Sequence, residues 1–176
     1  MNNLLKGINV YLIGMMGVGK TTVGQLLAKE LGYRFVDTDV LIEQVVGKTI
    51  NQIFTDSGEE EFRQLEAKVL SEVSAYTQLT VATGGGIVLQ QMNWSYLHQG
   101  LIVWLDAPVD LLIKRLQDDT TRPLLHTTDP AAALQNLLDK RRHLYAEADL
   151  HILINASDTP DVITSKIIAA IPSVLK

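Results

Sequence analysis

Residues 14–21 of the chain read GMMGVGKT, which matches the pattern G-x-x-x-x-G-K-S/T at every fixed position. In this pattern the glycines let successive backbone N–H groups turn inward around phosphate oxygens, and the lysine reaches the terminal phosphates as a point charge. The hydroxyl of Thr21 suits Mg²⁺, a cation that prefers oxygen ligands. The stretch therefore predicts a loop that binds the phosphates of a nucleoside triphosphate together with a metal ion.

The segments on either side of this phosphate loop are those that the chemistry requires. The apolar run Ile8–Ile13 predicts a strand that leads into the loop. A helix is expected after the loop, because apolar residues recur there with helical spacing and Gly32 is suited to ending it. The apolar residues are Val23, Leu26, Leu27 and Leu31.

Two carboxylates follow the second predicted strand, Tyr33–Val36. Asp37 and Asp39 are two residues apart, so on an extended segment both point to the same side, at the end of the strand where ligands bind in an α/β sheet. Asp39 alone could simply cap the expected helix Val40–Val46. The phosphate loop upstream favours a functional interpretation, because a kinase needs one carboxylate near its metal and another near its acceptor hydroxyl.

The next segment is expected to hold two helices, a short one over Thr49–Phe54 and a longer one that starts at Ser57 with Glu60 completing a capping box. Arg63 and Glu66 lie one helical turn apart on the longer helix. They form either a surface ion pair or a site in which Arg63 reaches the carboxylate of a substrate. Helical periodicity does not choose between these interpretations.

Three consecutive glycines, Gly84–Gly86, follow a third predicted strand, Leu79–Thr83. They cost backbone entropy and provide no packing, so something is expected to approach this backbone closely. A tight crossing of two chain segments would also explain them, but their position after a strand favours a ligand. Later in the chain, the polar stretch Asp118–Thr128 has no periodicity and is expected to form a lid that carries Arg122 as its cation.

Strands and helices continue to alternate to the end of the chain. This pattern predicts a three-layer α/β/α fold with a five-stranded parallel sheet joined by right-handed crossovers. The remaining predicted strands are Leu101–Leu105 and Leu150–Ile154, and the remaining helices are Gln90–His98, Pro108–Leu116, one capped by Asp129, and Pro160–Ile171.

Composition limits the classes of function. The 176 residues suit one domain, and the net charge of −5 argues against a protein that binds nucleic acid through a broad basic face. With no cysteine in the chain, neither a disulfide framework nor a thiolate metal site is available. No apolar run is long enough to span a bilayer and no targeting segment is evident. We expect a cytoplasmic protein that does not bind membranes and acts as a monomer.

An ordered set of motifs between residue 14 and about residue 149 resembles the shikimate kinase family. The motifs are GMMGVGKTTVG, FVDTDVLIE, IFTDSGEEEFRQLE, TGGG, TRPLL and RRHLYAEAD. The resemblance implies a P-loop NTPase fold like that of the nucleoside monophosphate kinases, as a single domain over residues 1–176. It also implies an acceptor-binding region at about residues 38–66 and a lid at about residues 118–128.

The resemblance also assigns residues to the nucleotide and the metal. Thr21 and Asp37 are expected to bind Mg²⁺, and Arg115 to lie near the adenine. The segment from Asn155 to Asp158 is expected to pass the adenine too, although it lacks the basic residue that some relatives carry there. The full set of expected ATP-binding residues is Gly17, Val18, Gly19, Lys20, Thr21, Thr22, Arg115, Arg122 and Asp158.

The implied reaction is transfer of the terminal phosphoryl group of ATP to the 3-hydroxyl of shikimate. Lys20, Asp39 and Arg122 are the expected catalytic residues, with Asp39 orienting the attacking hydroxyl. Planar guanidinium groups suit the carboxylate end of such a substrate. The expected substrate-binding residues are Asp39, Arg63, Gly84, Gly85, Gly86 and Arg141.

The sequence offers three alternatives to this function. Another small-molecule kinase of the same fold, for gluconate or a nucleoside monophosphate, is the nearest alternative, and a non-catalytic regulatory relative is the second. A GTPase switch is disfavoured because the chain has neither N-K-x-D nor D-x-x-G.

Overall fold

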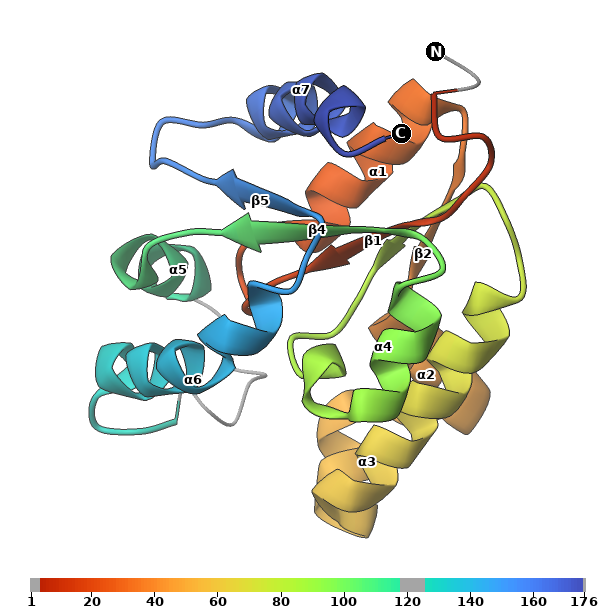
Figure 1. Ribbon diagram of the computed structural model, residues 1–176. Helices are drawn as coiled ribbons and strands as arrows, with labels where there is room; N and C mark the ends of the chain where they lie inside the picture. The colour runs from red at the N-terminus through yellow and green to blue at the C-terminus, as the bar shows by residue number, and fades with distance from the viewer. Residues whose placement is uncertain (1–3, 118–125, 176) are drawn as a thin grey trace.

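The computed structural model describes residues 4–117 and 126–175, which form a sheet enclosed between layers of helices (Figure 1). The sheet has five parallel strands in the order β2-β3-β1-β4-β5. The strands are β1 (Val10–Ile13), β2 (Arg34–Asp37), β3 (Leu79–Ala82), β4 (Leu101–Asp106) and β5 (Leu150–Leu153). The predicted α/β fold with five parallel strands is confirmed.

Helices cover both faces of this sheet. Figure 1 shows α1 and α7 on one face and α3, α4 and α6 on the other. The helices are α1 (Lys20–Leu31), α2 (Thr38–Val46), α3 (Ile50–Ser74), α4 (Gln91–Leu97), α5 (Val109–Leu116), α6 (Pro130–Tyr145) and α7 (Pro160–Ala170), with short 3₁₀ turns η1 (Ile87–Leu89) and η3 (Ile171–Ser173). None of the helices in the described ranges is both long and apolar enough to cross a membrane.

The central strands are short apolar segments because both of their faces are buried. Every residue of β1 and β3 is buried, as expected for parallel strands covered on both faces. In β5, at the edge of the sheet, the residues alternate between buried and exposed, so that Leu153 has an exposed fraction of 63%. The core therefore lies on both sides of the central strands and thins out toward β5.

Strand register brings three of the predicted motifs to one edge of the sheet. β1 lies at the centre, with Leu12 paired with Ala82 of β3, and Ala82 is in turn paired with Asp37 of β2. Asp37 is the last residue of β2, and the phosphate loop and the three glycines begin within two residues of Leu12 and Ala82. Because the strands are parallel, their carboxyl ends form one common edge, and these motifs meet there.

Two predicted helix starts differ from the structure. The helix after β2 begins at Thr38, and its cap is Asp37, whose side chain accepts hydrogen bonds from the backbone N–H groups of Asp39 and Val40. The suggestion that Asp39 caps this helix is therefore wrong. Asp39 lies in the first turn instead, where its side chain is not used as the cap.

The segment predicted to hold two helices is α3, in which two helical stretches meet at a break at Gly58, so the predicted division is confirmed. Gly58 has φ 84°, a conformation that glycine adopts at little cost, and the two helical stretches form a kink at this residue. The capping box is formed by Thr49 and Gln52 at the start of α3. The prediction of a capping box at Ser57 and Glu60 is wrong.

Candidate active site

The phosphate loop connects β1 to α1 and adopts the turn that its glycines allow. Gly14, Gly17 and Gly19 have φ values of 146°, 80° and 103°, which side-chain-bearing residues rarely adopt. The ammonium group of Lys20 folds over the loop and donates hydrogen bonds to the carbonyls of Gly14 at 2.6 Å and Met15 at 3.0 Å. The predicted lysine therefore lies on the loop, with its charge at the mouth of the phosphate site.

Thr21 and Asp37 lie together at this mouth, and their expected role in binding Mg²⁺ stays a prediction. The Thr21 hydroxyl donates a hydrogen bond of 2.8 Å to Asp37 Oδ2, while Asp37 Oδ1 accepts the N–H groups that begin α2. One carboxylate thus fixes a helix start and also faces the phosphate loop. The described residues contain no group of three or more His, Cys, Asp or Glu side chains that could hold a metal alone.

The end of helix α5 packs against the phosphate loop. Arg115, in its last turn, donates a hydrogen bond of 2.9 Å from Nη1 to the carbonyl of Val18. Leu116 packs so closely on Gly17 that a Cβ atom there would lie 2.8 Å from Leu116 Cγ. Arg115 is therefore adjacent to the phosphate loop, and its expected place near the adenine stays a prediction. Thr22 is exposed on the first turn of α1.

The three glycines after β3 form a turn on which charged side chains from three helices converge. A Cβ atom on Gly84 would lie 2.9 Å from a carboxylate oxygen of Asp39 and 2.9 Å from one of Glu66. A Cβ atom on Gly85 would lie 3.4 Å from Arg141 Nη1, and one on Gly86 would collide with the guanidinium of Arg63. A larger residue in place of Gly84 or Gly86 would therefore displace the charged groups. The same residues that were predicted to bind the substrate are brought together here.

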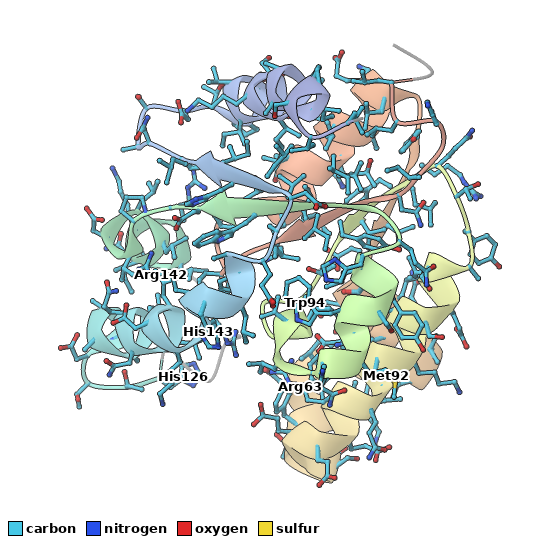
Figure 2. All side chains as sticks on the ribbon, viewed as in Figure 1. Arg63, Met92, Trp94, His126, Arg142 and His143 are labelled. Carbon is cyan, nitrogen blue, oxygen red and sulfur yellow. The ribbon has the colours of Figure 1, made fainter. Side chains whose placement is uncertain are left out.

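Arg63 and Glu66 form an ion pair of 3.0 Å that is largely buried. Their side chains have exposed fractions of 14% and 1%, so this is not the surface ion pair that the sequence left open. Arg63 also contacts Glu59 at 3.3 Å, and its guanidinium lies 5.2 Å from the ring centroid of Phe62. Figure 2 shows Arg63 on α3 near α4, the helix that carries Trp94.

Glu66 is the residue of this site that sequence reasoning missed as a functional candidate. Burial raises its pKa from 4.5 to about 7; the positive charge of Arg63 opposes this rise, and the negative charge of Asp39 adds to it. A signal for its burial was present, because Glu66 falls on the same helical stripe as Phe62, Val69 and Val73. A carboxylate on an apolar stripe is rare enough to indicate a site.

The charged groups around the glycine turn keep unused hydrogen-bonding capacity. Arg141 is 8% exposed, and its Nε is buried without a hydrogen bond to any described residue. The same holds for Arg63 Nε and Glu66 Oε2. Buried polar atoms are normally paired, so three such atoms around one turn make it a candidate site for a polar ligand.

Asp158, another residue predicted to bind the nucleotide, lies in the turn between β5 and α7. The Asp158 carboxylate accepts hydrogen bonds from the backbone N–H of Asn155 at 2.9 Å and from Lys166 at 2.6 Å, so it is held in the turn after β5. Its role in ATP binding stays a prediction. Lys166 supplies a positive charge next to a segment that has none of its own. Arg122, and residues 118–125 of the expected lid, lie outside the described residues.

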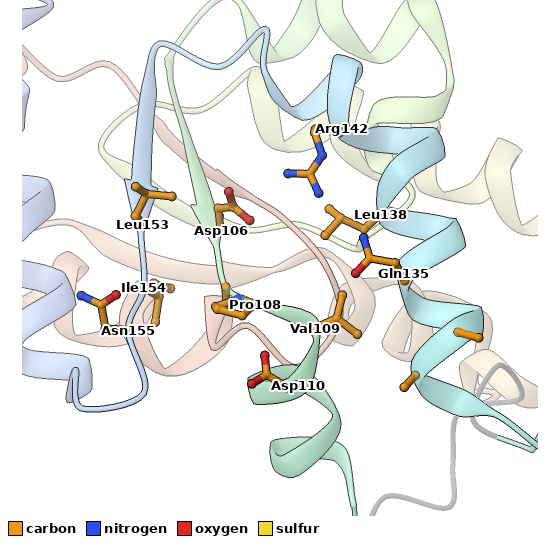
Figure 3. Close-up of a pocket in the computed structure, with 13 residues that line it drawn as sticks. Asp106, Pro108, Val109, Asp110, Gln135, Leu138, Arg142, Leu153, Ile154 and Asn155 are labelled. Atoms are coloured by element: carbon orange, nitrogen blue, oxygen red, sulfur yellow. The ribbon is translucent and has the colours of Figure 1, made fainter.

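A groove of about 750 Å³ lies beside the site, between α6 and the ends of β4 and β5 (Figure 3). Arg142 points into it from α6, while Asp106 and Leu153 line the opposite side. Within the described ranges its lining includes neither the phosphate loop nor the three glycines. The consecutive residues Arg141 and Arg142 therefore serve different surfaces, the glycine turn and the groove.

Comparison with known proteins agrees with this geometry. The sequence model of the family described as shikimate kinase matches residues 16–172. The chain belongs to the shikimate kinase family. It is 62% identical to the shikimate kinase of Nostoc sp. over 176 residues, which cover 100% of this chain and 97% of the relative. The shikimate kinase of Microcystis aeruginosa is 56% identical, with 99% of this chain and 92% of that protein covered.

Solved structures give the same family. A shikimate kinase from Acinetobacter baumannii in complex with shikimate superposes with a TM-score of 0.92 at 41% identity, covering 97% of this chain and 96% of that one. The shikimate kinase from Aquifex aeolicus has a TM-score of 0.81 at 32% identity, with coverage of 94% and 97%. A gluconokinase from Sinorhizobium meliloti, with a TM-score of 0.59 at 16% identity, shares the fold alone.

Proposed function

We propose that this protein transfers the terminal phosphoryl group of ATP to the 3-hydroxyl group of shikimate, giving ADP and shikimate 3-phosphate. The observation that carries the proposal is the convergence of Arg63, Arg141, Asp39 and Glu66 on the glycine turn, at the same edge of the sheet as the phosphate loop. The full-length similarity to shikimate kinases supports the same reaction.

Each end of the substrate has matching groups in this arrangement. Two guanidinium groups, from Arg63 and Arg141, suit a carboxylate because each offers a planar fork of donors. Asp39 faces the glycine turn from α2 and can accept the hydrogen of the attacking hydroxyl. Lys20 and Arg122 neutralise the charge that develops on the transferred phosphoryl group. Catalysis then consists mainly of alignment and electrostatic stabilisation.

A magnesium ion fits the residues at the mouth of the phosphate loop. Thr21 and Asp37 present a hydroxyl and a carboxylate 2.8 Å apart, both of them hard oxygen donors. When bound there with the nucleotide, Mg²⁺ would offset the charge of the phosphate oxygens. Asp37 is already held by the start of α2, so it can present its second oxygen without losing conformational freedom.

The rest of the proposal concerns the arrangement of the chain. Residues 1–176 form a single domain, with the acceptor bound over residues 38–66 and a lid over residues 118–128 that covers the reacting groups. Gly17 to Thr22 and Arg115 hold ATP, and the turn at Asp158 lies near the adenine. The protein acts as a monomer in the cytoplasm. A similar fold in a gluconokinase at 16% identity does not favour gluconate as the substrate.

The test is release of ADP from ATP and Mg²⁺, measured with shikimate, gluconate, a nucleoside monophosphate or no acceptor. Of these acceptors, we expect only shikimate to give release of ADP. Lys20→Ala should lower turnover by at least about a hundredfold, because it removes a preorganised positive charge. Lys29→Ala, an exposed lysine in the last turn of the same helix, serves as the matched control. Release that does not require shikimate, or near-normal turnover by Lys20→Ala, would contradict the proposal.

A further inference from the structure

Tyr145, the last residue of α6, is completely buried between the two halves of the site. It follows Arg141 by four residues, so both side chains project from the same face of the helix. Its ring stacks on Trp104 of β4, with centroids 5.7 Å apart and planes inclined by 25°. The ring is therefore fixed in position, and its hydroxyl is directed at a defined point.

That point is where the glycine turn meets the phosphate loop. The Tyr145 hydroxyl donates a hydrogen bond of 2.7 Å to the carbonyl of Gly85, and it lies 3.7 Å from the sulfur of Met15. Gly85 packs against the loop, because a Cβ atom on it would be 3.6 Å from the Gly14 carbonyl oxygen. One hydroxyl thus touches the backbone that faces the acceptor and a side chain of the loop that faces the nucleotide.

The positive charge of Arg141 also acts on this hydroxyl. Burial raises the pKa of Tyr145, and the charge of Arg141 opposes that rise. The phenol therefore stays protonated at neutral pH, so it can donate its one hydrogen to the carbonyl of Gly85. The hydrogen bond that fixes Gly85 is thus kept at neutral pH.

We propose that Tyr145 is a positioning residue for the phosphoryl transfer: its hydroxyl holds the glycine turn, on which Arg141 and the other charged side chains converge, at a fixed separation from the phosphate loop. The inference rests on the proposed function and adds a residue to it. Tyr145 acts through Gly85 and the glycine turn, where the expected acceptor-binding side chains converge, so its effect falls on binding of the acceptor and not on binding of ATP.

The test is Tyr145→Phe, which removes the hydroxyl and keeps the ring stacked on Trp104. We expect the KM for shikimate to rise about fivefold, the size of effect that loss of one buried hydrogen bond gives, while the KM for ATP changes by less than about twofold. Tyr11→Phe is the matched control, because Tyr11 is a buried tyrosine of β1 whose hydroxyl accepts a hydrogen bond from Asn9. It should leave both KM values unchanged.

Thermal unfolding of both variants separates positioning from stability. A Tyr145→Phe protein that has an unchanged KM for shikimate, shows equal rises in both KM values, or cannot be purified folded would overturn the inference, because the hydroxyl would then be merely structural. Turnover by the wild-type protein tests the proposed function independently. Wild-type turnover with shikimate, combined with an unaltered Tyr145→Phe enzyme, would reject the role of Tyr145 alone.

Discussion

Glu66 is an acid held in the protein interior beside two arginines and a second carboxylate, and its proton is coupled to the stability of the fold. Burial raises its pKa to about 7, above the value of 4.5 that applies to the unfolded chain. Between these pH values the native state holds the proton more tightly. The stability that Glu66 contributes is therefore complete below pH 4.5 and is lost as the pH rises through about 7.

Glu66→Gln removes this dependence, because the amide does not titrate. From pH 5 to pH 8 the free energy of unfolding of the wild type should fall relative to that of Glu66→Gln by on the order of 1–3 kcal/mol, measured by urea denaturation. Glu59→Gln is the control, since Glu59 pairs with the same arginine but has a side chain that is 63% exposed. Glu59→Gln keeps Glu66 and should therefore show the pH dependence of the wild type. Loss of that dependence in Glu59→Gln as well would show that the burial of Glu66 is not its cause.

Arg63 and Arg141 should act on one end of the substrate only. Replacing either by alanine should raise the Kd for shikimate by at least about tenfold, because a charged hydrogen bond is lost in a buried place, and should leave ATP affinity unchanged. Isothermal titration of each ligand measures this. Arg142→Ala is the control, because Arg142 lies next in sequence but faces the groove. A loss confined to ATP would mean that the two subsites are reversed.

At the level of elements, α1 sits on the sheet through a glycine. Gly24 is buried, and a Cβ atom on it would lie 2.7 Å from the ring of Phe35 and 3.3 Å from Leu12 Cδ1. This close packing of Gly24 on Phe35 and Leu12 sets the position of α1, whose first turn carries Lys20 and Thr21. Gly24 follows Lys20 by four residues and so lies on the same side of the helix, one turn further along, and a change at Gly24 should therefore affect the phosphate loop.

Gly24→Ala should destabilise the protein by about 1–3 kcal/mol through overpacking, although alanine is the better helix former. Gln25→Ala, at the exposed next position, should change stability by less than about 0.5 kcal/mol. Urea unfolding of both variants gives the comparison. Stabilisation by Gly24→Ala would mean that helix propensity outweighs the contact with Phe35.

Elements that carry a local signal could be predicted from the sequence. The phosphate loop, the end of α1 at Gly32 and the cap of α6 at Asp129 each depend on neighbouring residues alone, and all three were predicted. The start of α2 was not, because Asp37 and Asp39 are both good caps and only backbone geometry decides which one is used. The division of α3 close to Ser57 was predicted, but the capping box expected there from Ser57 and Glu60 was not formed, because the break is made by Gly58.

At the scale of the whole molecule, the order of the strands decides which distant residues meet. Alternating strands and helices predict a parallel sheet, but they do not say that β3 lies between β1 and β2. Arg63 and Arg141 come from helices far apart in the sequence, so their meeting was expected only from the family resemblance. Glu66 was overlooked because a pair three residues apart usually lies on the surface.

The parallel sheet also gives the molecule an end that takes no part in the chemistry. At the amino ends of the strands, the turn through Tyr76 and Gln78 is tied to Gly7 and Asn9 by backbone and side-chain hydrogen bonds. Tyr76 is exposed there, on the side of the sheet away from the phosphate loop. A dye, a solid support or a carrier attached at this turn would leave the phosphate loop and the glycine turn open to solution. The turn is therefore a suitable attachment point for immobilising the protein.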